Sequence, residues 1–261
     1  MNTWRSQWAL VTGASAGIGE QFATLLSAGG TNLVLAARRR ERLEQLATRL
    51  RSAYNVRVEV CAADLAHTSA PGGIFAFTKE KGIVVELLIN NAGFGAYGEF
   101  HAVDLARQLE MVRVNISAVI ALTRLYLPAM IERRRGGILI VSSTAAFQAV
   151  PYITTYAATK AFDLLFAEGL AEEVRRYGIR VCALCPGSTA TEFHQVGGQP
   201  AHTKRRQESA AKVARVGLRA LAEGKSLVVS GLANALGVQG QRLVPRRFVT
   251  RVAARLFRPA P

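Results

Sequence analysis

The chain has 261 residues, of which 50% are hydrophobic, so it can bury a large core in one or two domains. Its three cysteines are too few for a disulfide framework and odd in number, which favours a reducing compartment. We see no stretch that approaches the roughly 20 apolar residues of a membrane span, and the first residues lack the features of a secretory signal. We therefore expect a cytoplasmic protein.

The net charge of +15 is concentrated toward the end of the chain. Residues 204–261 hold 13 Lys or Arg against two Glu, a net charge of +11. Such a basic segment suggests contact with an acidic membrane, nucleic acid or carrier, and the alternative is a solvated arginine-rich surface. No recognised nucleic-acid motif accompanies it, so we expect no nucleic-acid partner.

Seven short apolar runs alternate with helix-length segments. The runs are residues 8–12, 31–37, 56–60, 86–90, 137–142, 179–185 and 226–230. Their continuous apolar character is what a sheet covered on both faces requires, and the strand–helix alternation implies parallel pairing. We predict an α/β fold: a single doubly wound Rossmann domain over residues 1–230, with a seven-stranded parallel sheet and helices on both faces.

A glycine-rich turn follows the first run directly. Gly13, Ser15, Gly17, Ile18 and Gly19 lie between this strand and a helical pattern. Glycines let the backbone approach a pyrophosphate, and the free N–H groups at a helix start favour its negative charge. The spacing is GxxxGxG, whereas the commoner dinucleotide fingerprint is GxGxxG. Placed at the first strand–helix turn, it predicts a dinucleotide site.

The end of the second run indicates which dinucleotide. Arg38 lies 19 residues beyond Gly19, where the adenosine ribose is expected. An acidic residue there accepts a hydrogen bond from a free 2′-hydroxyl, whereas a guanidinium pairs with a 2′-phosphate. We therefore predict NADP(H) rather than NAD(H), with Arg39 able to share the phosphate. The alternative is that these arginines simply begin a solvated helix.

Tyr156 and Lys160 are four residues apart in a helical pattern, so both lie on one face. An ammonium beside a phenol favours the phenolate, so we expect a lowered Tyr156 pKa and proton exchange near neutral pH. Ser143 ends the fifth run, where its hydroxyl can orient a substrate oxygen. Its neighbour Ser142 is the alternative, because adjacent strand residues point to opposite faces. The alternative is that the tyrosine and lysine share a helix face by chance and have no catalytic role.

Two further patterns have structural alternatives. The turn-forming sequence that begins at Asn90 and ends at Gly93 terminates the fourth run and suits a site beside adenosine, although turn formation alone explains it. Cys182 and Cys185 have a redox or metal spacing, but they lie in the sixth run, where residues three apart point to opposite faces. We interpret them as core cysteines and expect no metal.

Taken together, these motifs resemble the ordered set of the short-chain dehydrogenase/reductase family over about residues 8–192. The resemblance rests on TGASAGIG (12–19), Asp64, NNAG (90–93), Asn115, Ser143, Tyr156 with Lys160, and Pro186-Gly187 followed by Thr191. It implies Tyr156 as general acid/base, Lys160 on the nicotinamide ribose, and Ser143 on the substrate oxygen. The resemblance also implies that Asn115 completes a catalytic tetrad, since in the family this asparagine interrupts a helix and holds a water. The alternative is that Asn115 is an ordinary surface asparagine.

The resemblance also implies the cofactor contacts and a homodimer or homotetramer. The implied cofactor residues are Gly13, Ser15, Gly17, Ile18, Gly19, Arg38, Asp64, Asn90, Ala92, Gly93, Tyr156, Lys160, Pro186, Gly187, Thr189 and Thr191. A basic residue sometimes found before the second glycine of the turn is replaced here by Ala16, so Arg38 must account for more of the NADP(H) preference.

We predict an oxidoreductase that transfers a hydride between NADP(H) and a carbonyl or alcohol substrate, in either direction. Phe94, Phe147 and Phe193 flank the catalytic motifs and are predicted to line an apolar substrate pocket with Ser143 and Tyr156, although packing also explains them. The irregular stretch 187–209 is interpreted as a substrate loop. The alternative function is a non-catalytic NADP(H)-binding scaffold or sensor that acts through the basic end.

Residues 231–261 form a basic C-terminal extension, where family members that act on carrier-bound groups end in a VDGG-type segment; this departure puts a carrier substrate in doubt. Phe248, Val252 and Leu256 recur every four residues, each preceded by an arginine, after Pro245. The pattern predicts a basic amphipathic helix and peripheral membrane contact through residues 240–261. The alternative is that these three side chains pack against the body or a second subunit.

Overall fold

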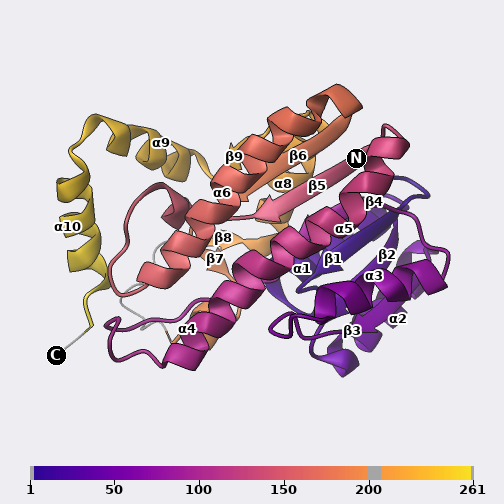
Figure 1. Ribbon diagram of the computed structural model, residues 1–261, viewed down its shortest axis with the longest axis horizontal. Coiled ribbons are helices and arrows are strands. Elements are labelled where there is room, and N and C mark those ends of the chain that lie inside the picture. Colours follow the sequence, from indigo (N-terminus) through magenta and orange to yellow (C-terminus); the bar gives the residue numbers. More distant parts are fainter. Residues whose placement is uncertain (1–2, 199–206, 260–261) are drawn as a thin grey trace.

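The protein is described here from a computed structural model that places residues 3–198 and 207–259. Seven parallel strands form one sheet in the order β3-β2-β1-β4-β5-β6-β9 (Figure 1). The strands are β1 Trp8–Thr12, β2 Asn32–Ala37, β3 Val58–Ala62, β4 Val85–Asn90, β5 Gly136–Val141, β6 Ile179–Cys185 and β9 Leu227–Val229. Each predicted strand occurs close to its expected bounds, and the doubly wound fold is confirmed.

Helices cover both faces of this sheet (Figure 1). They are α1 Gly17–Ala28, α2 Arg40–Tyr54, α3 Ala70–Glu80, α4 Leu105–Val112, the π-helix η1 Arg113–Ser117, α5 Ala118–Glu132, η2 Thr144–Phe147, α6 Thr154–Val174, η3 Arg175–Tyr177, α7 Phe193–Val196, α8 Ala210–Ala222, α9 Leu232–Gly240, η5 Gln241–Leu243 and α10 Arg246–Phe257. Helices α1, α2 and α8 pack on one face, and α3, α5 and α6 on the other.

Alternate residues of each central strand enter different cores. Leu10 and Leu88 belong to the core on the α5 and α6 face, whereas Val11 and Leu87 belong to the core under α1 and α8. Strand geometry sends successive side chains to opposite faces, so a sheet covered on both faces needs continuous apolar runs. This is the pattern that the sequence shows.

The two cysteines of β6 follow the same alternation. Cys182 lies in the core under α8, and Cys185 lies in the core under α6. Both thiols are free and buried, and burial raises the pKa of each to about 12. Their interpretation as core residues is confirmed, because thiols held neutral on opposite faces of a sheet cannot bind one metal ion or form one disulfide.

The segment predicted as an irregular substrate loop, 187–209, contains short regular elements. Strand β7, Thr189–Ala190, pairs in parallel with β8, Glu208–Ser209, and α7 lies between them. Residues 199–206 lie outside the described part of the chain. The small sheet ties both ends of the segment together beside the carboxyl end of β6.

One helical stretch, Leu105–Glu132, is long and apolar enough to cross a membrane by length and composition. The prediction that no stretch approaches a membrane span is therefore wrong by length and composition. A core helix passes the same test, and 44% of its most apolar window is buried inside the protein. The stretch comprises α4, η1 and α5, and α5 packs on α3 and the sheet.

Helix α10 begins after Pro245, as predicted, but packs on the body through a different stripe. Ala253 is buried, and the Tyr97 hydroxyl donates a 2.7 Å hydrogen bond to the Phe257 carbonyl. Phe248, expected to pack or enter a membrane, is 60% exposed. The stripe that packs on the body, which includes Ala253 and Phe257, lies one position later in the sequence than the predicted stripe with Val252 and Leu256. In Figure 1, α9 and α10 stand at the edge of the molecule.

Candidate active site

The carboxyl ends of the strands open into one crevice, a cavity of about 520 Å³. Loops after β1 to β6 line it, together with one side of α10. The predicted site residues that line it are Gly13, Ser15, Gly17, Ile18, Arg38, Asp64, Ala92, Gly93, Phe94, Ser143, Tyr156, Lys160, Pro186, Gly187, Thr189, Thr191 and Phe193. Sequence positions more than 170 residues apart therefore meet at one edge of the sheet, as parallel strands require.

The glycine turn after β1 forms a cradle that larger residues would fill. Gly13 and Gly17 have φ values of +65° and +59°, and a Cβ atom on Gly17 would lie 2.9 Å from Thr191 Cγ2. A Cβ on Gly19 would strike the carbonyl of Gly13, so this glycine packs α1 against the turn and lies behind the cavity wall. The cradle at the start of α1 fits a pyrophosphate.

Two arginines lie at the end of the crevice that β2 forms. Arg39 donates to the Ser15 hydroxyl at 3.2 and 3.3 Å and to Glu192 at 2.9 Å. Arg38 lies 3.9 Å from Asp64, and its side chain is 56% exposed. Both arginines line the cavity, as do Asp64 and Glu192, the carboxylates that lie beside them. The set fits an additional phosphate group.

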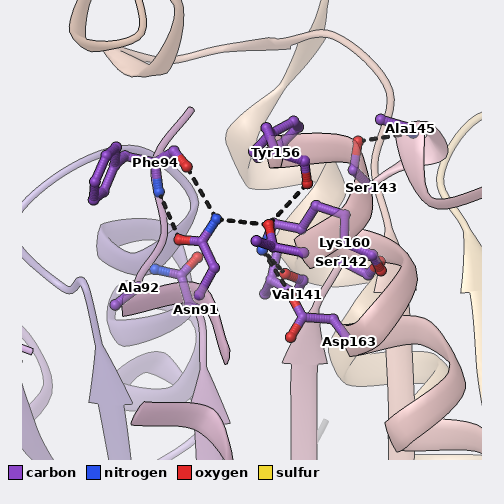
Figure 2. A network of polar contacts seen from close by, with 12 residues as sticks. Asn91, Ala92, Phe94, Val141, Ser142, Ser143, Ala145, Tyr156, Lys160 and Asp163 are labelled. Carbon is purple, nitrogen blue, oxygen red and sulfur yellow. Dashed lines mark hydrogen bonds and ion pairs between the residues drawn. The ribbon is translucent and has the colours of Figure 1, made fainter. Parts of the chain in front are cut away.

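Three of the four predicted catalytic side chains share one wall of the crevice (Figure 2). Tyr156 and Lys160 project from α6, and Ser143 follows β5. The Ser143 hydroxyl accepts a 3.1 Å hydrogen bond from the Ala145 amide, whereas the Ser142 hydroxyl donates to the Lys160 carbonyl at 2.7 Å. The two serines thus diverge as alternation predicts, and Ser142 is occupied by the backbone.

Asn115 lies behind this wall in a π-helical turn and is fully buried. Its amide donates to the Phe94 carbonyl and to the Thr159 hydroxyl, both at 3.0 Å, and its oxygen accepts from the Phe94 amide at 3.1 Å. A Cβ on Gly93 would lie 3.2 Å from the Asn115 oxygen and 3.3 Å from Lys160 Nζ. Interpretation as a surface asparagine is therefore wrong, because the π-turn directs this side chain inward.

The expected lowering of the Tyr156 pKa is not what the structure gives. Burial raises the pKa of the phenol above its ordinary value, while Lys160 and the Ser143 hydroxyl act in the opposite direction. The sequence shows the ammonium four residues away but not the loss of water around the phenol. Tyr156 is consequently protonated at neutral pH.

Asp163 is a site residue that the sequence analysis missed. Its carboxylate lies 2.9 Å from Lys160 Nζ, and the same ammonium donates to the Val141 carbonyl at 2.8 Å (Figure 2). Burial lowers the pKa of Lys160, but the charge and hydrogen bond of Asp163, together with Tyr156 and Cys185, act in the opposite direction, and the net pKa is raised. Lys160 therefore stays charged. The available signal was an acidic residue one turn after the lysine on the same helix face.

Asn90 does not lie where it was predicted. It is the last residue of β4 and points into the protein, where its amide donates to Thr123 in α5 at 3.1 Å. The next residue, Asn91, lines the cavity, and its amide donates to the Thr12 carbonyl at 2.8 Å. Because β4 extends through Asn90, the residue that faces the crevice is shifted by one.

The apolar end of the crevice differs from the prediction in two respects. Phe94 and Phe193 line it, and the Phe193 and Tyr156 rings lie 5.2 Å apart. Phe147 ends the 3₁₀ turn η2 and packs against the core instead of the cavity. The missing wall is supplied by α10, whose lining residues are Val249, Val252, Ala253, Leu256 and Phe257.

Comparison with known proteins gives consistent matches. The family model described as short chain dehydrogenase matches residues 7–200. A very-long-chain 3-oxoacyl-CoA reductase from Anas platyrhynchos is 34% identical over 225 residues, which cover 83% of this chain and 71% of that protein. For several other reductases of this name the match spans 60 to 62% of their length, less than two thirds.

Solved structures share the fold along nearly the whole chain. A short-chain dehydrogenase from Sphingobium yanoikuyae in complex with NADPH superposes with a TM-score of 0.83 at 29% identity, over 91% of this chain and 93% of that one. The bulky-bulky ketone specific alcohol dehydrogenase from Comamonas testosteroni superposes with a TM-score of 0.78 at 27% identity, over 93% of each chain.

Replacing Asn115 tests whether its three hydrogen bonds hold the site together. Asn115→Ala leaves buried groups of Phe94 unpaired, so we expect the free energy of unfolding to fall by about 2 kcal/mol or more. Asn115→Asp keeps the shape, but an ionised carboxylate cannot donate to Phe94 or Thr159, so it should also destabilise. Urea denaturation measures both, and wild-type stability in either variant would contradict the structural role.

Proposed function

The chain belongs to the short-chain dehydrogenase family of oxidoreductases, and on that premise we propose that it reduces the carbonyl of a long, apolar acyl substrate with NADPH. The observation that carries the proposal is the meeting of Tyr156, Lys160 and Ser143 on one wall of a crevice whose opposite parts are a phosphate cradle and an apolar wall. The cytoplasmic location and a homodimer or homotetramer stay predictions.

In this proposal each side chain has one task. NADPH, when bound, supplies the hydride from C4 of its nicotinamide. Tyr156 donates its phenolic proton to the carbonyl oxygen, and Ser143 donates a hydrogen bond that orients the same oxygen. Lys160 uses the N–H left after its bonds to Val141 and Asp163 to hold the nicotinamide ribose. Asn115 keeps Phe94 and α6 in register behind them.

The proposed cofactor preference rests on the two arginines at the end of the crevice that β2 forms. Arg39 is already directed at Ser15, which lies in the phosphate cradle, and Arg38 lines the same end. A 2′-phosphate bound between them gains charge-assisted hydrogen bonds that a 2′-hydroxyl does not. The NADPH complex of the Sphingobium yanoikuyae enzyme supports this assignment.

The substrate class rests on the cavity wall and on the relatives. Side chains of α10 close the cavity opposite the catalytic wall with apolar surface, which suits an acyl chain beside the reacting carbonyl. Very-long-chain 3-oxoacyl-CoA reductases are 32 to 36% identical to this chain. We propose a long-chain 3-oxoacyl thioester as substrate, reduced to the 3-hydroxy compound.

The outer side of the C-terminal extension supports contact with an anionic membrane. Its exposed large apolar residues include Leu243 (90%), Leu232 (77%), Leu236 (63%) and Phe248 (60%). Arginines accompany them, and the sequence from 232 to 258 contains no Asp or Glu. Exposed apolar side chains among cations match the boundary between anionic headgroups and acyl chains.

Charge argues against a second copy of the chain as the partner on this surface. A two-fold contact would place the same arginines of two chains opposite one another, and each chain has a net charge of +15. An anionic bilayer instead complements that charge. It is also the place where long acyl substrates partition.

Replacing the proposed proton donor tests the reaction. Tyr156→Phe should abolish NADPH oxidation with 3-oxopalmitoyl-CoA, because the ring remains but the proton is lost, while NADPH binding followed by fluorescence should persist. Tyr97→Phe removes a phenol that contacts α10 and serves as the comparison. Turnover that survives in Tyr156→Phe would refute the mechanism, and no turnover with any carbonyl compound would favour the scaffold alternative.

Replacing either cofactor arginine tests the preference. Arg39→Ala and Arg38→Ala should each raise KM for NADPH by about tenfold or more, since a charge-assisted hydrogen bond contributes about 1.5–3 kcal/mol, and leave KM for NADH unchanged. Arg49→Ala, in which the lost partner is Glu20, is the control. Equal effects on both cofactors would show that the arginines do not read the 2′-phosphate.

Vesicle sedimentation tests the membrane surface. The protein should bind vesicles of phosphatidylserine and phosphatidylcholine but not phosphatidylcholine alone. Leu243→Ser and Phe248→Ser should each weaken binding by about fivefold or more, whereas Leu165→Ser, which replaces a 69% exposed leucine of α6, should not. Self-association lost in the same two variants, without vesicle binding, would identify a second copy as the partner.

A further inference from the structure

The buried side chain of Asp163 has no task in the proposed reaction. Only 1% of it is exposed, and Oδ2 accepts the Lys160 ammonium at 2.9 Å. Its other oxygen, Oδ1, is buried without a hydrogen-bond partner among the described residues. A buried, half-satisfied carboxylate is costly, and a buried ion pair is weak evidence for a role in stability, because apolar residues of similar volume often replace such pairs without loss. Its place beside the reacting groups indicates a chemical role.

The position of the ion pair relative to Tyr156 suggests what that role is. Lys160 Nζ lies 5.9 Å from the centre of the Tyr156 ring, near enough for an uncompensated ammonium to favour the phenolate. Burial raises the pKa of the Asp163 carboxyl, while the Lys160 ammonium opposes that rise, and the ionised carboxylate places a negative charge directly on the ammonium. Asp163 therefore offsets part of the effect of the ammonium on the phenol, and acts in the same direction as burial, which favours the protonated form.

We propose that Asp163 is a positioning residue, which holds the Lys160 ammonium and compensates its charge so that Tyr156 remains a protonated donor for carbonyl reduction. The inference rests on the proposed function, in which Tyr156 is that donor. With Val141 it also fixes two of the three N–H groups of Lys160, so the third has a defined direction.

Other ionisable groups around Lys160 do not replace Asp163. Cys185 faces it from β6, but burial raises the pKa of that thiol to about 12, so it is neutral. Glu168, on a later turn of α6, raises the pKa of Cys185 further. From β5 the ammonium meets the neutral Val141 carbonyl, and the neutral Asn115 of η1 borders Gly93, as Lys160 does. Asp163 is thus the single carboxylate that pairs with this ammonium within the described residues.

The test is the pH dependence of kcat/KM for reduction of 3-oxopalmitoyl-CoA by NADPH. Activity falls on the alkaline side as Tyr156 loses its proton. Asp163→Asn removes the charge but keeps the size, so the alkaline limb should move to lower pH by about one unit or more. Asp163→Glu, which restores the charge, should return the limb toward the wild-type position.

A spectroscopic titration gives the same answer without a substrate. Tyrosinate absorbance of the wild type, minus that of Tyr156→Phe, isolates the titration of Tyr156. The same difference in the Asp163→Asn background should have a lower midpoint. An unchanged midpoint would overturn the role of Asp163, whether or not 3-oxopalmitoyl-CoA is turned over, so the two proposals fail separately.

Two further variants keep the test decisive. Glu172→Gln removes an exposed carboxylate from the same helix, where it pairs with Arg175, and should leave both titrations unchanged. Asp163→Ser, smaller and also neutral, replaces the asparagine variant if circular dichroism shows that the latter has lost its fold. A reduced rate with an unmoved pH profile in the folded variant would mean a purely structural residue and would overturn the proposal.

Discussion

The ammonium of Lys160 is held out of water in the wall of the crevice, and a buried charge persists only where other groups replace its hydration. The Val141 carbonyl and the Asp163 carboxylate do so here. Val141 ends strand β5, and Asp163 lies on α6, so these contacts of the ammonium link the strand to the helix. That helix also carries Tyr156. The place of the phenol, its protonation and the direction of the lysine therefore depend on one set of contacts.

The sheet and the approximate place of the site could be predicted from the sequence, because local patterns of apolar residues determine where the strands form and end. A strand covered on both faces must be apolar at every position, so its sequence is distinct from that of an amphipathic helix. Parallel strands all end at one edge, so residues that follow them meet whatever their separation in sequence. Ser143 after β5 and Thr189 after β6 lie in one crevice for this reason.

Finer placement depends on where a strand stops. The paired amides at Asn90 and Asn91 look equivalent in sequence, but β4 extends through Asn90, so the pleat turns that side chain toward α5. A shift of one residue changes the face. Burial cannot be read from the local sequence either. In the sequence Asp163 is one more polar residue of a helix, and it is removed from water because α6 packs against β6 and its neighbours. The predicted direction of the Tyr156 pKa shift was wrong because burial of the phenol is likewise absent from the local sequence pattern.

Helix α10 shows how one helix can serve two surfaces. The four-residue period of the sequence indicates a stripe of Phe248, Val252 and Leu256, yet the most buried residue is Ala253 on the adjacent stripe. Val252 and Leu256 line the cavity and are also 39% and 45% exposed. They therefore form a rim that joins the cavity to the outer apolar face of the helix. If this face lies on a bilayer, an acyl chain reaches the catalytic wall by passing this rim, without crossing the polar surface of the protein.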